Sequence, residues 1–455
     1  MHSNSFKHRV IKSGLWIFSG NMLTQIIRFG SNLIMTRLLA PEMFGLMALA
    51  TVFIFGLNLL SDIGLKQILI QNKRSDDTFV NTVWTIQVIR GWMIWVFSLI
   101  VAAIFYMLSS WDWLPDDSVY SNELFPFIIA VIGLNSIAYG YEPTKLTYGN
   151  RNLTLKLNVS IALISQLLGF FAMLLWAYFR PDVWALVVGS LVATLSNTLM
   201  SYFVIDGKRN YFCFDKSITN EIFHFGKWIF LSSILGFLAS SSDRLLLGGL
   251  IDATQFGYYA IAGLIIGVFN QLFSSVIHSV GFPALSETFR DKPHELKKVF
   301  YKLRLPFDLI LIFSCSFLFV VADSVVRILY DSRYADVGWV LQILSISLFE
   351  LRYRLAGECF LAMGKPKLQT VLILINLIFL YVFGFVAFKF FGFSGAIWVV
   401  ACSSLATIPF NLFYLNKFEI LDWKKELIVL PMLLIGYVVG SILDLFFHKL
   451  ILGNI

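Results

Sequence analysis

The stretch GKWIFLSSILGFLASSSDRLLLGGLIDATQFG, residues 226–257, lies at the middle of the chain and repeats the first hydrophobic stretch. Shifting the chain by 212 residues without a gap brings 11 identical residues into register over positions 14–50. Two hydrophobic runs and the polar link between them align together, so we predict an internal duplication. The matched residues of the first copy are Gly14, Trp16, Ile17, Phe18, Leu23, Leu33, Leu38, Phe44, Gly45, Ala48 and Ala50.

The composition indicates an integral membrane protein. Of the 455 residues, 58% are hydrophobic and only 14% are charged, which is far too apolar for a soluble domain of this size. The apolar residues come in runs of about 20, the length of a membrane-spanning helix, and they show no sustained apolar/polar alternation. We therefore expect helical spans rather than the strands of a barrel.

The basic balance and the cysteines exclude several other classes. The net charge is +7, but the Lys and Arg residues lie in short loops between apolar runs, where they act as orientation signals rather than as a nucleic-acid surface. Four cysteines without CxxC spacing predict neither a disulfide framework nor a metal site. The first apolar run follows basic residues, as in a signal peptide, but its length and its later copy predict an uncleaved first span.

Thirteen apolar segments are candidate spans. The predicted ranges are 14–36, 44–63, 83–108, 124–142, 157–178, 183–204, 226–250, 256–280, 305–326, 337–360, 369–390, 393–415 and 427–447.

The loop charges predict the orientation. With the N-terminus in the cytoplasm, the inner segments carry 24 Lys and Arg residues and the outer segments carry 6. The outer loop at 111–123 has three aspartates and no basic residue, in agreement with this assignment. We expect a multi-pass membrane protein with its N-terminus in the cytoplasm.

The repeat length predicts the domain organisation. A shift of 212 residues contains six spans, and an even number makes both copies enter the membrane in the same direction. We expect an all-α protein of two parallel six-helix bundles. The predicted parts are a first bundle at 1–205, a cytoplasmic linker at 206–225, a second bundle at 226–416 and an extra hydrophobic segment at 417–455. In that last segment Pro431, Gly436 and Gly440 disfavour a simple helix, so a re-entrant or peripheral segment is an alternative.

A polar stripe crosses the first span. Asn21, Gln25, Arg28 and Asn32 are spaced by four, three and four residues, which places them on one helical face. Polar groups inside a membrane are costly, so such a stripe faces a protein interior or water. Two interpretations follow: the stripe packs against another helix and Arg28 pairs with a carboxylate, or it lines a hydrated, substrate-binding cavity.

The second copy supports the cavity interpretation. The residues at a shift of 212 include Ser233, Ser240 and Arg244, so each half carries one arginine on this face. Adjacent Asp243 and Arg244 point about 100° apart on a helix and are poor partners for each other. For Asp243 we weigh a structural salt bridge against a role in ion coupling.

The tenth predicted span carries more charge than any other. Glu350, Arg354 and Glu358 are spaced by four, so they can form a self-neutralising ladder along one helical face. Glu350 is also a candidate for ion coupling. Arg352 points away from Arg354 and lacks an acid on its own helix, which makes it a further candidate for the cavity.

Other charged residues favour structural roles. Asp308 is placed to pair with Arg304, and Asp323 with Arg327. His278, the one histidine within a predicted span, is more often a satisfied structural residue than a ligand or a switch. We find no Walker A loop, HExxH or GxSxG motif, so neither a catalytic site nor a cofactor is predicted, apart from possible coupling to H⁺ or Na⁺.

Two parallel repeats with short loops and buried basic stripes are typical of a secondary transporter. Guanidinium groups bind phosphate and pyrophosphate through paired hydrogen bonds, which suits an anionic cargo.

Several stretches also carry a family resemblance. LIMTRLLAPEMFGLMALA (33–50), LLSDIGLKQILIQ (59–71), FPALSE (282–287) and RILYDSRYADVGWVLQILS (327–345), together with the central stretch, resemble the Wzx-like polysaccharide flippases. These belong to the multidrug/oligosaccharidyl-lipid/polysaccharide (MOP) superfamily, and the resemblance covers about residues 10–415. It implies a MATE-like, V-shaped pair of bundles.

The resemblance also implies the activity and the partners. It implies a protein of the bacterial cytoplasmic (inner) membrane that moves an undecaprenyl-pyrophosphate-linked oligosaccharide from the cytoplasmic to the outer leaflet, by alternating access, for surface polysaccharide synthesis. Membrane lipids and the polysaccharide polymerase and chain-length proteins are the implied partners, with no nucleic acid. Related flippases often have fourteen spans, one more than predicted here.

Two alternatives stay open at this stage. A drug or small-cation extruder of the same superfamily needs buried carboxylates rather than arginines in its cavity. A membrane O-antigen polymerase or glycosyltransferase needs a sizeable outer loop, whereas the outer loop at 109–123 has neither Arg nor His.

Overall fold

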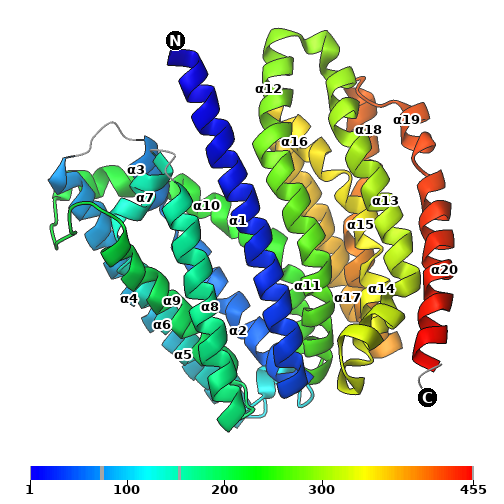
Figure 1. The fold of residues 1–455 in the computed structure, drawn as a ribbon, viewed down its shortest axis with the longest axis horizontal. Helices are drawn as coiled ribbons and strands as arrows, with labels where there is room; N and C mark the ends of the chain where they lie inside the picture. The colour runs from blue at the N-terminus through cyan, green and yellow to red at the C-terminus, as the bar shows by residue number, and fades with distance from the viewer. Residues whose placement is uncertain (1, 72–75, 152–154, 453–455) are drawn as a thin grey trace. The chain divides into compact units, whose positions relative to one another are not determined.

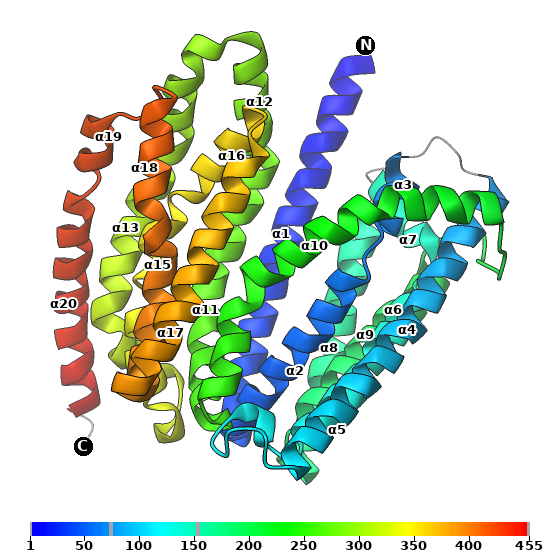
Figure 2. The same cartoon turned by 180° about the vertical axis from the view of Figure 1, so that it is seen from behind.

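The computed structural model describes residues 2–71, 76–151 and 155–452, and these ranges contain helices and connecting segments without a β-strand. The chain divides into two compact units, Met1–Ala253 and Thr254–Ile455, and each is considered by itself. Figures 1 and 2 show the helices from opposite sides.

The first unit contains ten α-helices among its described residues. They are α1 (His2–Leu38), α2 (Pro41–Leu60), α3 (Leu65–Gln71), α4 (Asp77–Ser110), α5 (Phe125–Ile132), α6 (Leu134–Gly140), α7 (Thr144–Arg151), α8 (Leu155–Phe179), α9 (Trp184–Val204) and α10 (Lys216–Leu250).

The second unit contains ten more within its described part. They are α11 (Ala253–Val276), α12 (Phe282–Asp291), α13 (Leu296–Leu329), α14 (Val337–Leu344), α15 (Ser347–Leu351), α16 (Arg354–Ala362), α17 (Pro366–Ser403), α18 (Ile408–Lys417), α19 (Trp423–Ile428) and α20 (Pro431–Leu452). A short π-helix, η2 (Ile277–Gly281), continues α11.

The prediction of a helical membrane protein is confirmed. Eight helical segments of the described chain are long and apolar enough to cross a membrane, and Phe125–Gly140 is a shorter apolar one. These eight do not establish the predicted total of thirteen. One of them, Pro366–Lys417, covers two predicted spans, and the predicted span 337–360 is broken into α14, α15 and α16. The helices α1 and α10, which carry the polar stripes, are not among the eight.

Several helix boundaries recur at the predicted shift of 212 residues. The first helix ends at Leu38 and α10 ends at Leu250, while α2 begins at Pro41 and α11 at Ala253. The assembly of two six-helix bundles remains a prediction.

The helix α10 crosses the boundary at residue 226 where we predicted the second bundle to begin. This helix begins at Lys216, inside the predicted linker, where the side chain of Asp215 accepts a hydrogen bond from the backbone N–H of Ile218. Ile218 and Ile222 are buried against Phe79 and other apolar residues of α3 and α4. The first turns of α10 are therefore part of the core of the first unit.

A kink separates two predicted spans in the second unit. Within α17, Gly392 has φ 61° and ψ −145°, a conformation that a residue with a side chain rarely adopts. The predicted spans end at 390 and begin at 393, so the break lies where the sequence placed it.

The C-terminal hydrophobic segment is a helix, α20, that packs along α13 (Figure 1). A Cβ atom on Gly436 would lie 2.5 Å from the carbonyl oxygen of Phe313, and one on Gly440 would lie 3.2 Å from that of Phe317. The two glycines thus permit close helix packing, and the expectation that they disfavour a simple helix is wrong. The hydroxyl of Ser324 on α13 also donates to the carboxylate of Asp444 at 2.5 Å.

Candidate functional site

The structure brings Arg28 of α1 near Arg244 of α10 within the first unit. Their guanidinium groups are close enough for the like charges to act on one another, and protein atoms crowd around the guanidinium of Arg28. By whole-residue surface area both Arg28 and Arg244 are still exposed, so the enclosure is incomplete. Among the described residues, no carboxylate lies within ion-pair distance of either group. The two arginines therefore form a patch of positive charge that the described protein leaves uncompensated.

Neighbouring helices hold α1 and α10 in place. The side chain of Gln166 on α8 donates a hydrogen bond to the carbonyl oxygen of Thr24 on α1 at 3.2 Å. On α10, the ring of Phe237 packs on Gly56 of α2 and lies 6.4 Å from the ring of Phe55. Each arginine is thus presented by a helix that a second helix supports.

The remaining polar residues of the two stripes differ in their environments. Gln25 is half-buried and has an interaction partner, whereas the buried Oδ1 of Asn32 has no hydrogen-bond partner within the described part of the chain. Ser240 is exposed and donates to the carbonyl oxygen of Phe237 at 3.2 Å. The side chain of Asn21 lies outside what the structure describes.

Asp243, beside Arg244, is half-buried and has an interaction partner. The predictions for this residue, a structural salt bridge or ion coupling, both remain untested.

Arg90 on α4 has a structural role that sequence reasoning did not assign. Its Nε donates to the hydroxyl of Ser61 at 3.0 Å, and its Nη2 donates to the carbonyl oxygen of Asn58 at 2.6 Å. These acceptors lie at the C-terminal end of α2, where carbonyl groups lack partners within the helix and attract positive charge. Arg90 therefore caps α2.

Arg352, our third candidate for the cavity, lies in a buried ion-pair cluster of the second unit. Its side chain is 2% exposed, and it contacts the carboxylates of Glu426 on α19 and Asp308 on α13. Arg304 completes the cluster, with Nη1 2.6 Å and Nη2 3.0 Å from the two carboxylate oxygens of Glu426. The charge of Arg352 is thus neutralised inside the protein, which argues against the cavity role.

The same cluster confirms one local prediction and extends it. Arg304 pairs with Asp308 at 3.3 Å, as its i, i+4 spacing indicated. The hydroxyls of Tyr301 and Tyr353 also donate to Glu426, at 2.9 and 3.1 Å. Two arginines and two acids balance in charge, so the cluster joins α19 to α13 and to the turn before α16 without a net buried charge.

The predicted ladder in the tenth span does not form. Arg354 donates to the hydroxyl of Ser274 on α11, and Glu358 instead faces His278. Half-buried Glu350 is near enough to Arg354 for electrostatic attraction, but no ion pair within 4.0 Å joins them among the described residues. The helix breaks at residues 352–353, so the regular spacing that the ladder requires is interrupted. In contrast, the predicted pair of Asp323 and Arg327 is present at 2.7 Å.

A comparison of the five span arginines identifies the candidate site. Arg90 caps a helix, Arg352 belongs to the buried cluster, and Arg354 has a hydroxyl partner and a nearby acid. Arg28 and Arg244 remain, exposed and without a carboxylate partner in the described chain. This pair has the charge and the access that binding an anion requires.

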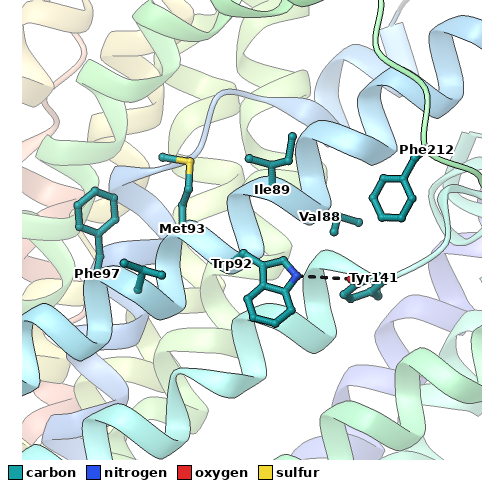
Figure 3. Close-up of a pocket in the computed structure, with 8 residues that line it drawn as sticks. Val88, Ile89, Trp92, Met93, Phe97, Tyr141 and Phe212 are labelled. Atoms are coloured by element: carbon teal, nitrogen blue, oxygen red, sulfur yellow. Dashed lines mark hydrogen bonds between the residues drawn. The ribbon is translucent and has the colours of Figure 1, made fainter.

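A separate pocket of about 480 Å³ in the first unit is apolar and cannot serve such an anion (Figure 3). Trp92, Met93 and Phe97 of α4 line it, with Tyr141 after α6 and Phe212 before α10. Nε1 of Trp92 donates a hydrogen bond to the hydroxyl of Tyr141 at 3.5 Å (dashed line in Figure 3).

Comparison with known proteins places the chain in a family. Residues 34–338, well over half of the chain, match the model of a family described as polysaccharide biosynthesis proteins. The chain belongs to this family.

Curated relatives agree with the assignment of this polysaccharide biosynthesis protein. It is 24% identical over 427 residues to the capsular polysaccharide biosynthesis protein CapF of Staphylococcus aureus, covering 90% of this chain and 100% of the relative. It is 23% identical over 347 residues to the lipopolysaccharide biosynthesis protein WzxC of Escherichia coli K12, covering 75% of this chain and 67% of the relative. A shorter match, 22% over 200 residues, is to the probable low-salt glycan biosynthesis flippase Agl15 of Haloferax volcanii, covering 44% and 42% of the two chains.

Solved structures with the same fold are membrane transporters. The lipid II flippase MurJ in an inward closed conformation matches with a TM-score of 0.63 at 13% identity, covering 96% of this chain and 99% of that one. An inward-facing multidrug resistance MATE transporter of the MOP superfamily matches with a TM-score of 0.60 at 13% identity, covering 94% and 96%. The predicted MATE-like and MOP-like fold is thereby confirmed.

Proposed function

We propose that this polysaccharide biosynthesis protein flips an undecaprenyl-pyrophosphate-linked oligosaccharide repeat unit from the cytoplasmic to the outer leaflet of the membrane. The pyrophosphate binds to Arg28 and Arg244, and the glycan crosses through a hydrated cavity by alternating access. The protein acts as a transporter and not as an enzyme.

The observation that carries the proposal is the pair of neighbouring, exposed arginines without a carboxylate partner in the described chain. Two like charges at short distance repel one another, more strongly in the low dielectric of a membrane protein than in water. A pyrophosphate carries several negative charges and accepts paired hydrogen bonds from guanidinium groups, so its binding removes this repulsion.

The cost of crossing the bilayer explains why such a protein is needed. Each hydroxyl group of a glycan left without a hydrogen bond in hydrocarbon costs several kcal/mol, so spontaneous flipping is prohibitively slow. A hydrated path removes this penalty, and Gln25 on α1 and Ser240 on α10 are polar side chains on the helices that carry the two arginines. The polyprenyl tail can remain in the lipid.

The relatives support this cargo over the alternatives. One relative is named as a probable glycan biosynthesis flippase, and two others are named for the biosynthesis of capsular polysaccharide and lipopolysaccharide. A cation extruder would need carboxylates at its exposed charged site, whereas the site found here, Arg28 with Arg244, is basic. A polymerase or glycosyltransferase is not favoured by these relatives.

The test is replacement of both arginines, Arg28→Ala with Arg244→Ala, in cells that depend on the protein. We expect loss of surface polysaccharide export at an unchanged protein level, with the completed lipid-linked repeat unit accumulating on the cytoplasmic face. Arg28→Lys with Arg244→Lys should restore export in part, because lysine keeps the charge but not the paired hydrogen bonds.

The matched control is Arg327→Ala, since Arg327 is an exposed arginine that pairs with Asp323. Export in this variant should be normal. Normal export in the double alanine variant would exclude the two arginines as the substrate site, and build-up of unpolymerised repeat units outside the cell would favour a polymerase.

The cellular setting is part of the proposal. The charge bias of the loops favours a cytoplasmic N-terminus in the inner membrane. The product is then delivered to the outer leaflet, where polymerase and chain-length proteins are the expected partners. Coupling to H⁺ or Na⁺ would drive the cycle, with Asp243 and Glu350 as the candidates suggested by the sequence.

A further inference from the structure

Two polar contacts join α11 and its continuation η2 to α16 in the second unit. Arg354 donates to the hydroxyl of Ser274, and Nδ1 of His278 lies 3.6 Å from Oε1 of Glu358. The residues within each helix are four apart, so the two contacts lie one turn from each other along one face. The proposed glycan site uses neither contact.

The two members of the second contact differ sharply in exposure. The side chain of Glu358 is 7% exposed, whereas that of His278 is 66% exposed. Apolar residues of the core of this unit, including Ile277, Leu355 and Cys359, surround this position. An ionised carboxylate in such surroundings is costly unless a positive charge or a proton compensates it.

No other charge takes that role within the described chain. Glu358 and His278 have no second ion-pair partner among the described residues, and Arg354 on the same helix is turned to Ser274. The other charged residues on α12, α13, α17 and α18, the helices around η2 and α16, are not within ion-pair distance of the two; they are Glu287, Arg290, Asp291, Lys297, Lys298, Lys302, Arg304, Asp308, Asp323, Arg327, Lys367, Lys389 and Lys417. Of these, Arg290 and Asp291 pair with each other.

A local irregularity of the helix sets the geometry of the contact. The backbone N–H of Phe282 donates to the carbonyl oxygen of Ile277, five residues back, so His278 lies within a π-helical turn. A Cβ atom on Gly281 would lie 2.9 Å from Cδ1 of Leu355, which shows how closely η2 approaches α16. Single π-helical turns of this kind occur frequently at functional sites.

A small pocket lies between η2, α13 and α16. This pocket of about 190 Å³ is lined by Val280 and Gly281 of η2, Leu355 of α16 and Lys302 and Pro306 of α13. Its lining is apolar apart from Lys302, so it does not hold water for the pair, and a proton reaches the pair through the exposed side of the imidazole.

We propose that His278 and Glu358 form a proton-binding site that couples transport to the transmembrane proton gradient. The pair takes one proton from water on one side of the membrane and returns it to water on the other, so no further reactant is needed. With the proton bound, the pair is neutral, either as imidazolium and carboxylate or as imidazole and carboxylic acid. Without it, the buried carboxylate is uncompensated, which favours a different conformation.

The chemistry of the pair favours a proton over Na⁺. Hard cations take oxygen ligands, whereas the group that faces Glu358 is an imidazole nitrogen. The coupling to transport rests on the proposed flippase function, whereas proton binding by the pair can be measured without transport.

The transport experiment uses the full-length protein in liposomes with a fluorescent, short-chain polyprenyl-pyrophosphate disaccharide as the probe. We expect a pH gradient to accelerate flipping by the wild type severalfold. In Glu358→Gln and in His278→Gln, the flipping rate with the gradient should equal the rate without it. The control Glu287→Gln, at an exposed position on α12, should keep the full response. Retention of the response in Glu358→Gln together with its loss in Glu350→Gln would overturn the assignment.

A second measurement separates this proposal from the flippase function. Infrared difference spectra of the solubilised protein between acidic and alkaline buffer should contain a band of either the protonated carboxyl group or the imidazolium ring, and this band should be lost in Glu358→Gln and lost or altered in His278→Gln. If Glu358→Gln does not fold, His278→Gln alone still tests proton binding, because an exposed residue can be replaced without disturbing the core. An unchanged band in both variants would refute proton binding, whereas absence of flipping by the wild type would refute only the transport function.

Discussion

At the scale of single residues, the span arginines differ in what compensates their charge. The pairing of Arg28 with Arg244 at one site could be predicted from the sequence, because the duplication places them on corresponding faces of two repeated helices. The partner of Arg352 could not be predicted, since Glu426 lies 74 residues further along the chain and outside the repeat. Spacing rules detect contacts within one helix, and an ion pair between distant helices leaves no such pattern.

The buried cluster yields a prediction for stability. Arg352→Met leaves an excess negative charge and Glu426→Gln leaves an excess positive charge, so each single variant should lose about 3–5 kcal/mol of stability. In the double variant the charge of Arg304 is again balanced by that of Asp308. The stability lost by the double variant should therefore be smaller than the sum of the stabilities lost by the two single variants. Thermal unfolding of the purified proteins in detergent measures this. Strictly additive losses would mean that Arg352 and Glu426 do not interact.

At the scale of helices, sequence patterns located the membrane segments better than their packing. The break at Gly392 separates two predicted spans, and the starts of α2 and α11 follow the predicted shift. The glycines of α20 were misinterpreted, because helix propensity in isolation disfavours glycine, whereas contact with a neighbouring helix favours it. Propensity is a property of one segment, and the neighbour that reverses it is known only from the fold.

The close packing of α20 on α13 predicts the effect of a single methyl group. In Gly436→Ala the new Cβ would lie 2.5 Å from the backbone oxygen of Phe313, which cannot rotate away. We expect a loss of about 1–3 kcal/mol from overpacking. The control is Val438→Leu, at an exposed position on the same helix. A lowered melting temperature in detergent for the glycine variant alone would support the packing, and equal melting temperatures would contradict it.

At the scale of the whole molecule, composition was sufficient to predict a helical membrane protein, and the family resemblance was needed to predict the MATE-like fold. The repeat did not indicate where the chain divides into its two compact units. The first turns of α10 are buried in the first unit through Ile218 and Ile222, although the helix is a copy of the start of the chain. A duplication records how the sequence arose, while side-chain packing, here of Ile218 and Ile222 on α3 and α4, decides which helices group together. The orientation of the chain is a property of this scale too, since it depends on the summed charge of all loops.

The charge bias predicts which loops face the cytoplasm. In a variant without native cysteines, Asp116→Cys in the acidic outer loop and Arg209→Cys in the basic linker each place one thiol at an exposed position. A membrane-impermeant maleimide should label the first in intact spheroplasts and the second only after the membrane is permeabilised, because loops rich in Lys and Arg stay on the cytoplasmic side. The reverse labelling pattern would mean that the protein is inserted in the opposite orientation. The proposed direction of transport would then be wrong.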